Sequence, residues 1–513
     1  MMTHLPILAV LVPLIAAIVL LLATDASIAA KRAISALALG FLVTAAGAQI
    51  IVAGDSGIQV YRLGDWPAPY GIVLVLDRLA ALMVALTAAL AVPVFFAATS
   101  GTDTRGPHFH AFLQFQLMGL NGAFLTGDLF NLFVFFEILL LASYGLLMHG
   151  GGLARARAGI AYVVLNLCGS ALFLIALGLL YGFLGTLNMA DFGVALQKVS
   201  PADQGVVAVM CGLLVSVFLL KAAVLPIGFW LRHVYTAATL PVAALFVIMT
   251  KVGIYALYRV ITIALAAAPF TAGLLQPWLI WLALGTVALG CLGLLAASSL
   301  GLVAANLVLI SGGTLLLAAA DPGVQTLAAG LYYLVQTSLV TGALFLLADA
   351  IGRQRGEPAD TLDAGPPLHS YAKLGLLFVV FSVAASGMPP LSGFLGKIMM
   401  MQALRDSAHW QAIWVALIVS GFVAALVLAR SASVFFWEPG APGIAEKTEV
   451  AYQPAPGLSL ALGMIVLAVL AISFAPAPLT SYARATAEQM TAREAYLPAV
   501  LGDPSAVQRE RRP

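Results

Sequence analysis

Four ionisable residues lie deep inside apolar stretches of the 513-residue chain and are its best candidates for chemistry: Glu137, Lys221, Lys251 and Lys397. Glu137 is the first glutamate of the chain and stands nine positions after Asp128. If Asp128 marks a membrane surface, a helix would place Glu137 roughly 13–14 Å deeper, near the midplane of a bilayer core about 30 Å thick. An acid at that depth costs at least ~2.5–3.5 kcal/mol, so we treat it as a functional-site candidate.

These four side chains have the chemistry of a proton relay. Desolvation disfavours the charged form of a buried group, whereas a partner of opposite charge favours it. Groups held between the two effects exchange protons near neutral pH, and each exchange changes the field at its neighbour. The alternative hypothesis is a structural membrane scaffold in which the charges form inert ion pairs. Lys251 and Lys397 come closer to segment ends, where long side chains can reach the interface.

Asp77 and His233 are weaker relay candidates. Asp77 directly precedes Arg78 and is predicted either to pair locally with that arginine or to join the relay. His233 follows Arg232 in a predicted loop, where a histidine is more often interfacial than part of a relay.

Two of the apolar stretches are predicted to be broken helices. Pro226 cannot donate a hydrogen bond to the carbonyl of Ala222, which is the residue after Lys221. Pro389 and Pro390 lie a few residues before Lys397, among several glycines. Unpaired backbone at membrane depth is tolerated only where it is buried in protein or lines a cavity. Paired interruptions in the two halves of a chain are typical of a transport site.

The elements that position these residues are membrane-spanning helices. The chain is 62% hydrophobic and only 9% charged, against about 25% charged residues in soluble domains. We therefore predict an all-α polytopic membrane protein with about fourteen spans. The predicted spans are 5–24, 33–53, 70–98, 109–127, 129–148, 158–187, 205–229, 237–262, 273–297, 299–320, 325–350, 371–402, 411–437 and 456–477.

The basic residues predict the orientation of these spans. Loops after odd-numbered helices hold more lysines and arginines than loops after even-numbered helices, and such residues favour the cytoplasmic side. We therefore expect both termini outside the cytoplasm, although the arginines of the C-terminal tail would then face outward. The loops after odd-numbered helices hold Lys31, Arg32, Arg105, Arg155, Arg157, Arg232, Arg353, Arg355, Lys373 and Lys447, and the others hold Arg62, Lys198, Arg259 and Arg405.

Several classes of function are disfavoured. A net charge of +2 argues against binding to nucleic acid. The three cysteines stand singly in apolar runs, which predicts no disulfide framework and no zinc or iron–sulfur site. Neither a zinc-protease motif nor a dinucleotide-binding fingerprint is found in the sequence, so an enzyme is not expected.

Four segments carry a resemblance to a known family. LNGAFLTGDLFNLFVFFE at 120–137, TKVGIY at 250–255, GMPPLSGFLGK at 387–397 and the segment 331–349 resemble the D-type subunit of the multisubunit Mrp-type (Pha/Mnh) cation/proton antiporters. The resemblance covers nearly the whole chain. The first segment is specific to this type of subunit, whereas the others also resemble the antiporter-like proton-pumping subunits of respiratory complex I.

The resemblance implies a fold and a set of roles. It implies fourteen helices, with helices 4–8 and 9–13 as inverted five-helix repeats and helices 7 and 12 broken. The expected segments are 1–107 for helices 1–3, 108–262 and 273–438 for the repeats, and 456–513 for helix 14 and a polar tail. By position, the essential acid is Glu137, the broken-helix lysine is Lys221, and Lys251 and Lys397 continue the line of charges.

The resemblance also implies the setting. The chain would be a proton-translocating subunit of a secondary Na⁺(or K⁺)/H⁺ antiporter in the bacterial inner membrane, in contact with membrane lipid. Its partners would be small hydrophobic subunits and a second antiporter-like subunit, with no cofactor in this chain. The alternative is a redox-driven pump subunit of a complex I-like enzyme or membrane-bound hydrogenase. Gln336 stands where relatives usually have histidine, so a second-half proton path would have to run on water.

Overall fold

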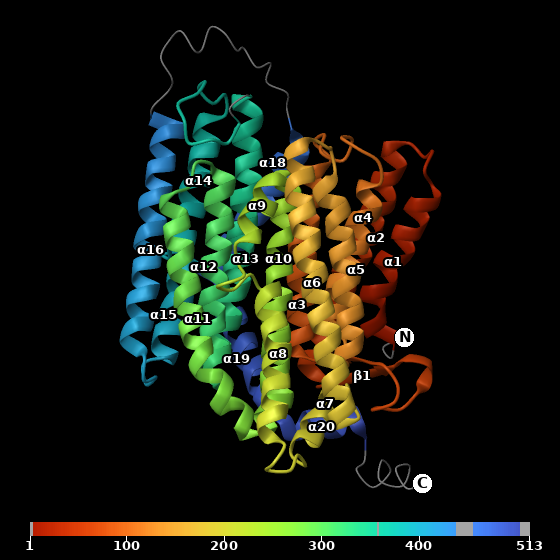
Figure 1. The fold of residues 1–513 in the computed structure, drawn as a ribbon. Helices are drawn as coiled ribbons and strands as arrows, with labels where there is room; N and C mark the ends of the chain where they lie inside the picture. Colours follow the sequence, from red (N-terminus) through yellow and green to blue (C-terminus); the bar gives the residue numbers. More distant parts are fainter. Residues whose placement is uncertain (1–3, 357–358, 438–454, 503–513) are drawn as a thin grey trace.

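The computed structural model describes residues 4–356, 359–437 and 455–502, and these are mostly helical. Figure 1 shows most of the helices running alongside one another, with both termini at the same end of the bundle. The helices are α1 (Leu5–Leu22), α2 (Ile28–Asp55), α3 (Arg78–Ala98), α4 (Phe109–Leu125), α5 (Leu129–Met148), α6 (Leu153–Leu184), α7 (Met189–Leu196), α8 (Gln204–Lys221), α9 (Trp230–Ala237), α10 (Leu240–Arg259), α11 (Pro269–Leu295), α12 (Leu300–Ala320), α13 (Val324–Arg355), α14 (Tyr371–Ser386), α15 (Ser392–Ala403), α16 (Trp410–Ala432), α18 (Pro456–Phe474), α19 (Ala477–Thr491) and α20 (Arg493–Leu501).

The structure confirms an all-α polytopic membrane protein. Within the described residues, 12 helices are long and apolar enough to cross a membrane. α14 is apolar but has only 16 residues, and α4 has 17. The prediction of about fourteen spans counts these two shorter helices as well.

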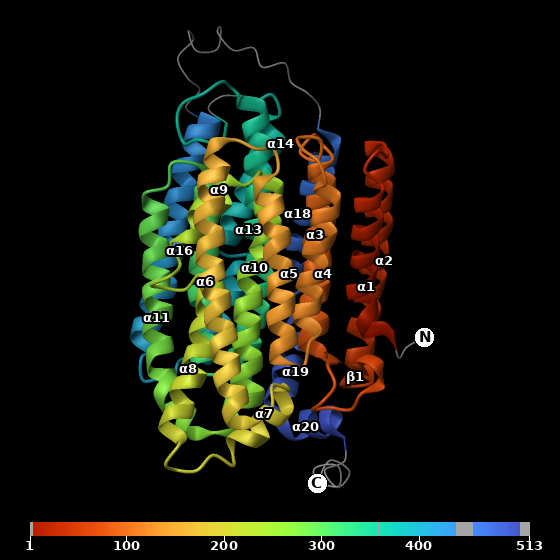
Figure 2. The same cartoon turned by 45° about the vertical axis from the view of Figure 1, so that its right-hand side comes forward.

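The core of the bundle consists of α10, α12 and α13. These helices are almost entirely buried, whereas fewer than half of the residues in the apolar stretches of α6, α11 and α16 are buried. Figure 2 shows the outer helices flanking this centre. A helix that is apolar on all sides is expected either in a protein core or against lipid. Polar side chains on the three central helices are therefore shielded from lipid.

Both predicted broken helices are interrupted in the structure. α8 ends at Lys221 and α9 begins at Trp230, with Pro226 between them. α14 ends at Ser386 and α15 begins at Ser392, with the two prolines between them. Each break leaves backbone groups without helical partners at a depth where water is scarce.

Three segments differ from the sequence prediction. The first residues of the predicted span 70–98 form a strand, β2 (Val73–Leu76), which pairs antiparallel with β1 (Gln59–Arg62). α10 continues into a π-helical turn at Val260–Ala264. In the predicted polar tail, α19 buries Ala483, Thr486, Ala487 and Met490 and packs against α13 and α3.

A cluster of charged and polar side chains around the loop between α3 and α4 connects the first helices. Asp103, in the loop between α3 and α4, accepts hydrogen bonds from Arg32 Nε at 2.7 Å and Nη2 at 2.9 Å. It also lies 3.2 Å from His110 Nε2. Burial opposes ionisation of Asp103, but the hydrogen bonds from His110 and Arg32 outweigh burial and lower its pKa to about 2. The cluster therefore holds an ionised carboxylate that links α2 to α4.

Candidate functional site

Glu137 faces α6 and not the lipid. It lies on α5, is partly buried, and accepts a hydrogen bond from the hydroxyl of Ser170 on α6. Ser170 itself is buried. The carboxylate therefore has a polar partner inside the bundle, as expected for an acid placed deep in a membrane.

The same face of α6 also reaches Lys221. Lys221 is the last residue of α8, and its ammonium donates a 3.2 Å hydrogen bond to Asn166 Oδ1. Asn166 and Ser170 are four residues apart, so they are neighbours on one helix face. The described residues contain no direct ion pair between Glu137 and Lys221. Each charge instead has its own polar partner on this face of α6, the hydroxyl of Ser170 for Glu137 and the amide oxygen of Asn166 for Lys221.

Lys251 lies on the far side of the first helix break. It is fully buried on α10 and donates a 2.6 Å hydrogen bond to Ser311 Oγ on α12. A Cβ added to the next residue of α12, Gly312, would lie 3.4 Å from the carbonyl oxygen of Ala222. In the part of the chain that the structure describes, no hydrogen bond is donated to that carbonyl. The free carbonyl at the broken end of α8 therefore lies near Gly312, the residue that follows the partner of Lys251.

Lys397 sits in a pocket of backbone carbonyls at the second break. Its ammonium lies 3.1 Å from the Ser386 carbonyl, 3.4 Å from the Leu417 carbonyl and 3.4 Å from Ser420 Oγ. A Cβ added to Gly421 would lie only 2.9 Å from the ammonium. Neutral oxygens surround this lysine, and a glycine makes room for it.

A small cavity joins Gln336 to Lys397. Gln336 on α13 donates a 3.1 Å hydrogen bond to the Ala384 carbonyl. Gln336 and Lys397 line a space of about 10 Å³ together with Thr337 and Thr341. That volume is close to the minimum for one water molecule, and its lining supplies the polar partners a water needs. The cavity is thus large and polar enough to hold one water molecule between Gln336 and Lys397.

The weaker candidates lie elsewhere. Asp77 does not pair with Arg78, as one prediction held, but with Arg259 at the end of α10, at 2.5 Å from Nη2. Both side chains are buried, and Tyr255 accepts a further 2.9 Å bond from Arg259. This pair joins α3 to α10 and is remote in sequence, so no local pattern indicates it. His233 is exposed on α9.

Sequence reasoning missed the uncharged members of the site. Each of these residues binds one of the four charged groups, and all are buried: Asn166, Ser170, Ser311 and Ser420. Their only signal is a polar residue within an apolar span, which many serines and threonines of this chain share. In the described residues, no group of three or more His, Cys, Asp or Glu side chains is placed to hold a metal ion. The arrangement instead combines four separated charges with hydroxyl, amide and carbonyl groups between them.

Comparison with known proteins shows the family to which the chain belongs. The family model described as "NADH:quinone oxidoreductase/Mrp antiporter, TM" matches residues 126–426. The chain is 38% identical to a protein of Rhizobium meliloti named as the D-type subunit of a probable K(+)/H(+) antiporter, covering 98% of both chains. It is 35% identical to the corresponding protein of Bacillus subtilis, named as the D-type subunit of a Na(+)/H(+) antiporter, covering 98% of this chain and 100% of the relative.

A solved structure shares the fold. A chain of the Mrp complex from Dietzia sp. superposes with a TM-score of 0.86 at 24% identity, with 98% of this chain and 99% of that chain covered. At that identity the likeness establishes the fold, while the family model and the more similar sequences establish the relationship. The chain belongs to the NADH:quinone oxidoreductase/Mrp antiporter transmembrane family.

Proposed function

We propose that this chain is the proton-translocating subunit of a multisubunit secondary Na⁺ or K⁺/H⁺ antiporter. The observation that carries the proposal is the shared face of α6, where Ser170 binds Glu137 and Asn166 binds Lys221. An acid and a lysine held on one helix face by separate polar partners can bias one another's protonation without locking into an ion pair. That is the property a relay needs and a scaffold does not.

The proton path follows the four charges. A proton taken up at Glu137 raises the local positive potential and favours deprotonation of Lys221. Deprotonation of Lys221 changes the electrostatic field across the break between α8 and α9 and so affects Lys251, whose partner Ser311 precedes the glycine nearest the free carbonyl of Ala222. From there the path continues through the water-sized cavity at Gln336 to Lys397. Water and hydroxyl groups carry the proton between the charges.

The relatives support a monovalent metal cation as the counter-transported ion. Two of them are named as antiporter subunits, one for K(+)/H(+) and one for Na(+)/H(+), and we extend this activity to the present chain. We propose that its partners are the other membrane subunits of such a complex. We also propose that the complex lies in the bacterial inner membrane. We further propose that residues 108–262 and 273–438, which hold predicted spans 4–8 and 9–13, are inverted repeats and that both termini face away from the cytoplasm.

The experiment is proton flux in vesicles that contain the whole complex. A pH-sensitive dye is followed after addition of Na⁺, K⁺ or Li⁺, with choline as the control cation. The proposal predicts that Na⁺ or K⁺ dissipates a preformed proton gradient and that choline does not. The competing reading is a redox-driven pump, because the family description also includes NADH:quinone oxidoreductase. Proton flux that depends on an electron donor and ignores the cation would establish that reading instead.

A further inference from the structure

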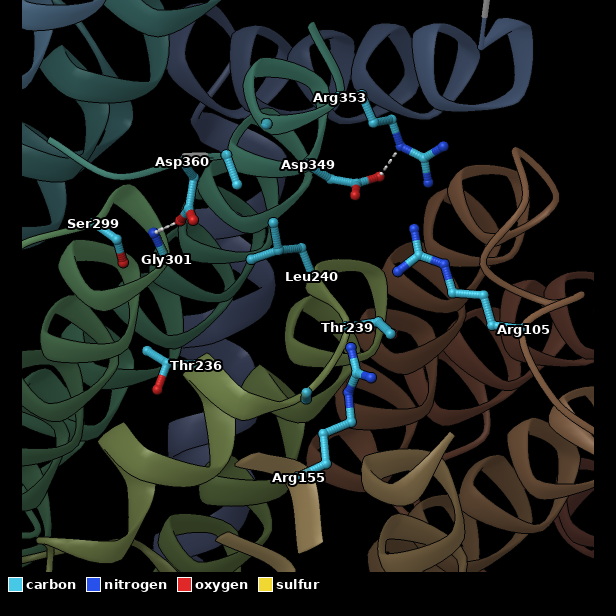
Figure 3. Close-up of a pocket in the computed structure, with 13 residues that line it drawn as sticks. Arg105, Arg155, Thr236, Thr239, Leu240, Ser299, Gly301, Asp349, Arg353 and Asp360 are labelled. Carbon is cyan, nitrogen blue, oxygen red and sulfur yellow. Dashed lines mark hydrogen bonds and ion pairs between the residues drawn. The ribbon is translucent and has the colours of Figure 1, made fainter. Parts of the chain in front are cut away.

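A cavity lined by arginines lies apart from the line of buried charges. It has a volume of about 410 Å³ and is bordered by the loop after α3, the starts of α6, α10 and α12, and the end of α13. This volume falls in the range of about 300–1,000 Å³ found for small-molecule pockets. Figure 3 shows Arg105, Arg155 and Arg353 approaching it from different elements.

The two carboxylates that border this cavity are already engaged. Asp349 accepts a 2.8 Å hydrogen bond from Arg353, four residues along α13. Asp360 accepts a 2.7 Å hydrogen bond from the backbone of Gly301 at the start of α12. Figure 3 shows both contacts as dashed lines. The lining therefore holds three arginines and two carboxylates, and only Arg353 forms an ion pair with one of these acids.

Arg105 and Arg155 remain as cations without an ion pair in the described part of the chain. Within the described residues, no hydrogen bond or ion pair involves the side chain of Arg105. Arg155 donates only to neutral carbonyls, those of Ala237 at 3.0 Å and Gly151 at 2.7 Å. A Cβ added to Gly150 would meet Arg155 Nη1 at 3.3 Å and Arg105 Cδ at 3.7 Å, so both side chains pass the same glycine. Like charges on neighbouring side chains repel each other, and an anion bound beside them would relieve that repulsion.

A buried hydroxyl points to the same conclusion. Thr239 is 4% exposed and borders the cavity, and its Oγ1 has no hydrogen-bond partner among the described residues. Buried polar groups are rarely left without a partner, so this hydroxyl remains available as a hydrogen-bonding group at the wall of the cavity. Thr239 is also the N-cap of the 20-residue helix α10, whose first N–H groups favour negative charge.

We propose that this cavity binds a phosphate group through Arg105, Arg155 and Thr239. Planar guanidinium groups match the oxygens of phosphate in pairs, and the hydroxyl and the helix N-terminus supply further donors. The three arginines of the lining outnumber its two carboxylates, which favours an anion over a cation in this cavity. The phosphate belongs either to a lipid headgroup or to a free anion, and both present the same chemistry. The proposal concerns binding alone and does not depend on the proposed transport function.

The test is thermal unfolding of the purified complex that contains this chain, freed of lipid in a neutral detergent. One arm titrates inorganic phosphate against chloride at constant ionic strength. A second arm titrates a short-chain phosphatidic acid against the matching diacylglycerol, which lacks the phosphate. A saturable rise in Tm in either arm supports the site, and the arm that responds identifies the source. If neither arm shows a saturable rise in Tm, the proposal is overturned.

Variants assign the effect to the cavity. Arg105→Gln breaks no hydrogen bond among the described residues, and it is expected to weaken binding about tenfold or more because one charge-assisted contact is lost. Thr239→Val keeps the side-chain shape and is expected to weaken binding by a smaller factor. Arg405→Gln is the control, since Arg405 is an exposed arginine outside the cavity. Equal binding by wild type, Arg105→Gln and Thr239→Val would place the ligand elsewhere and overturn the assignment.

Discussion

Gly253 offers a way to disturb the centre of the proposed relay without changing any charge. It lies on α10, two residues from Lys251, where α10 packs against the broken end of α8. A Cβ added at this position would lie 2.6 Å from Ala222 N, 2.9 Å from Phe218 O and 3.0 Å from Ala222 Cα. All three are backbone atoms, so no side-chain rotation relieves the overlap.

The structure sets the size of the effect of Gly253→Ala. Ordinary Cβ contacts begin at 3.4 Å, so α10 and the end of α8 must separate by about 0.8 Å in a closely packed interior. If α10 takes up this shift, the bond from Lys251 Nζ to Ser311 Oγ lengthens from 2.6 Å, toward about 3.4 Å, past the usual hydrogen-bond range. Overpacking costs about 1–3 kcal/mol. Loss of one charge-assisted hydrogen bond corresponds to about tenfold or more in rate.

The assay is cation-dependent proton flux in vesicles with equal amounts of assembled complex. Gly253→Ala is expected to lower the flux about tenfold or more and to lower the Tm of the complex. Gly182→Ala on α6 is the matched control, because a Cβ there meets nothing within 4 Å. Unchanged flux in Gly253→Ala would refute the reasoning that the packing of α10 against the end of α8 holds Lys251 in place for proton transfer.

Three further predictions concern other parts of the bundle. Asp77→Asn leaves a buried arginine unpaired, and chemical denaturation is expected to show a loss of about 3–5 kcal/mol; an unchanged midpoint would contradict this. Gln336→Leu removes the polar wall of the small cavity, so proton flux should fall while the complex stays assembled; normal flux would exclude a path through this cavity. The pKa of Asp103 lies near 2, below its ordinary 3.8, because its hydrogen bonds from His110 and Arg32 outweigh burial. Its contribution to stability is therefore present above about pH 4 and lost as pH falls toward 2; Asp103→Asn should lose less stability over that range, and an identical acid profile would count against the cluster.

The sequence predicted much of the architecture because membranes limit the possible structures. Apolar runs of spanning length indicated the helices, since backbone groups in lipid must bond within their own segment. Prolines indicated both helix breaks, because proline removes a donor and clashes with the preceding turn. The rarity of charge in hydrocarbon singled out Glu137 and Lys221.

The remaining features depend on packing between distant segments. Asp77 pairs with Arg259, which is 182 residues away. The local sequence around either residue does not predict this pairing. Asn166 and Ser170 matter because α6 lies against both α5 and α8, which spacing within α6 does not reveal. The strand β2 replaced the start of a predicted span because an apolar run of a few residues fits either a strand or a helix.

The central claim is that Glu137 and Lys221 exchange protons through the polar face of α6. Its most direct test is cation-dependent proton flux of Glu137→Ala and Lys221→Ala in vesicles, with assembly checked by co-purification of the other subunits. We predict that each variant assembles and that its flux falls to the level of vesicles without the complex. Normal flux in either assembled variant would contradict the claim.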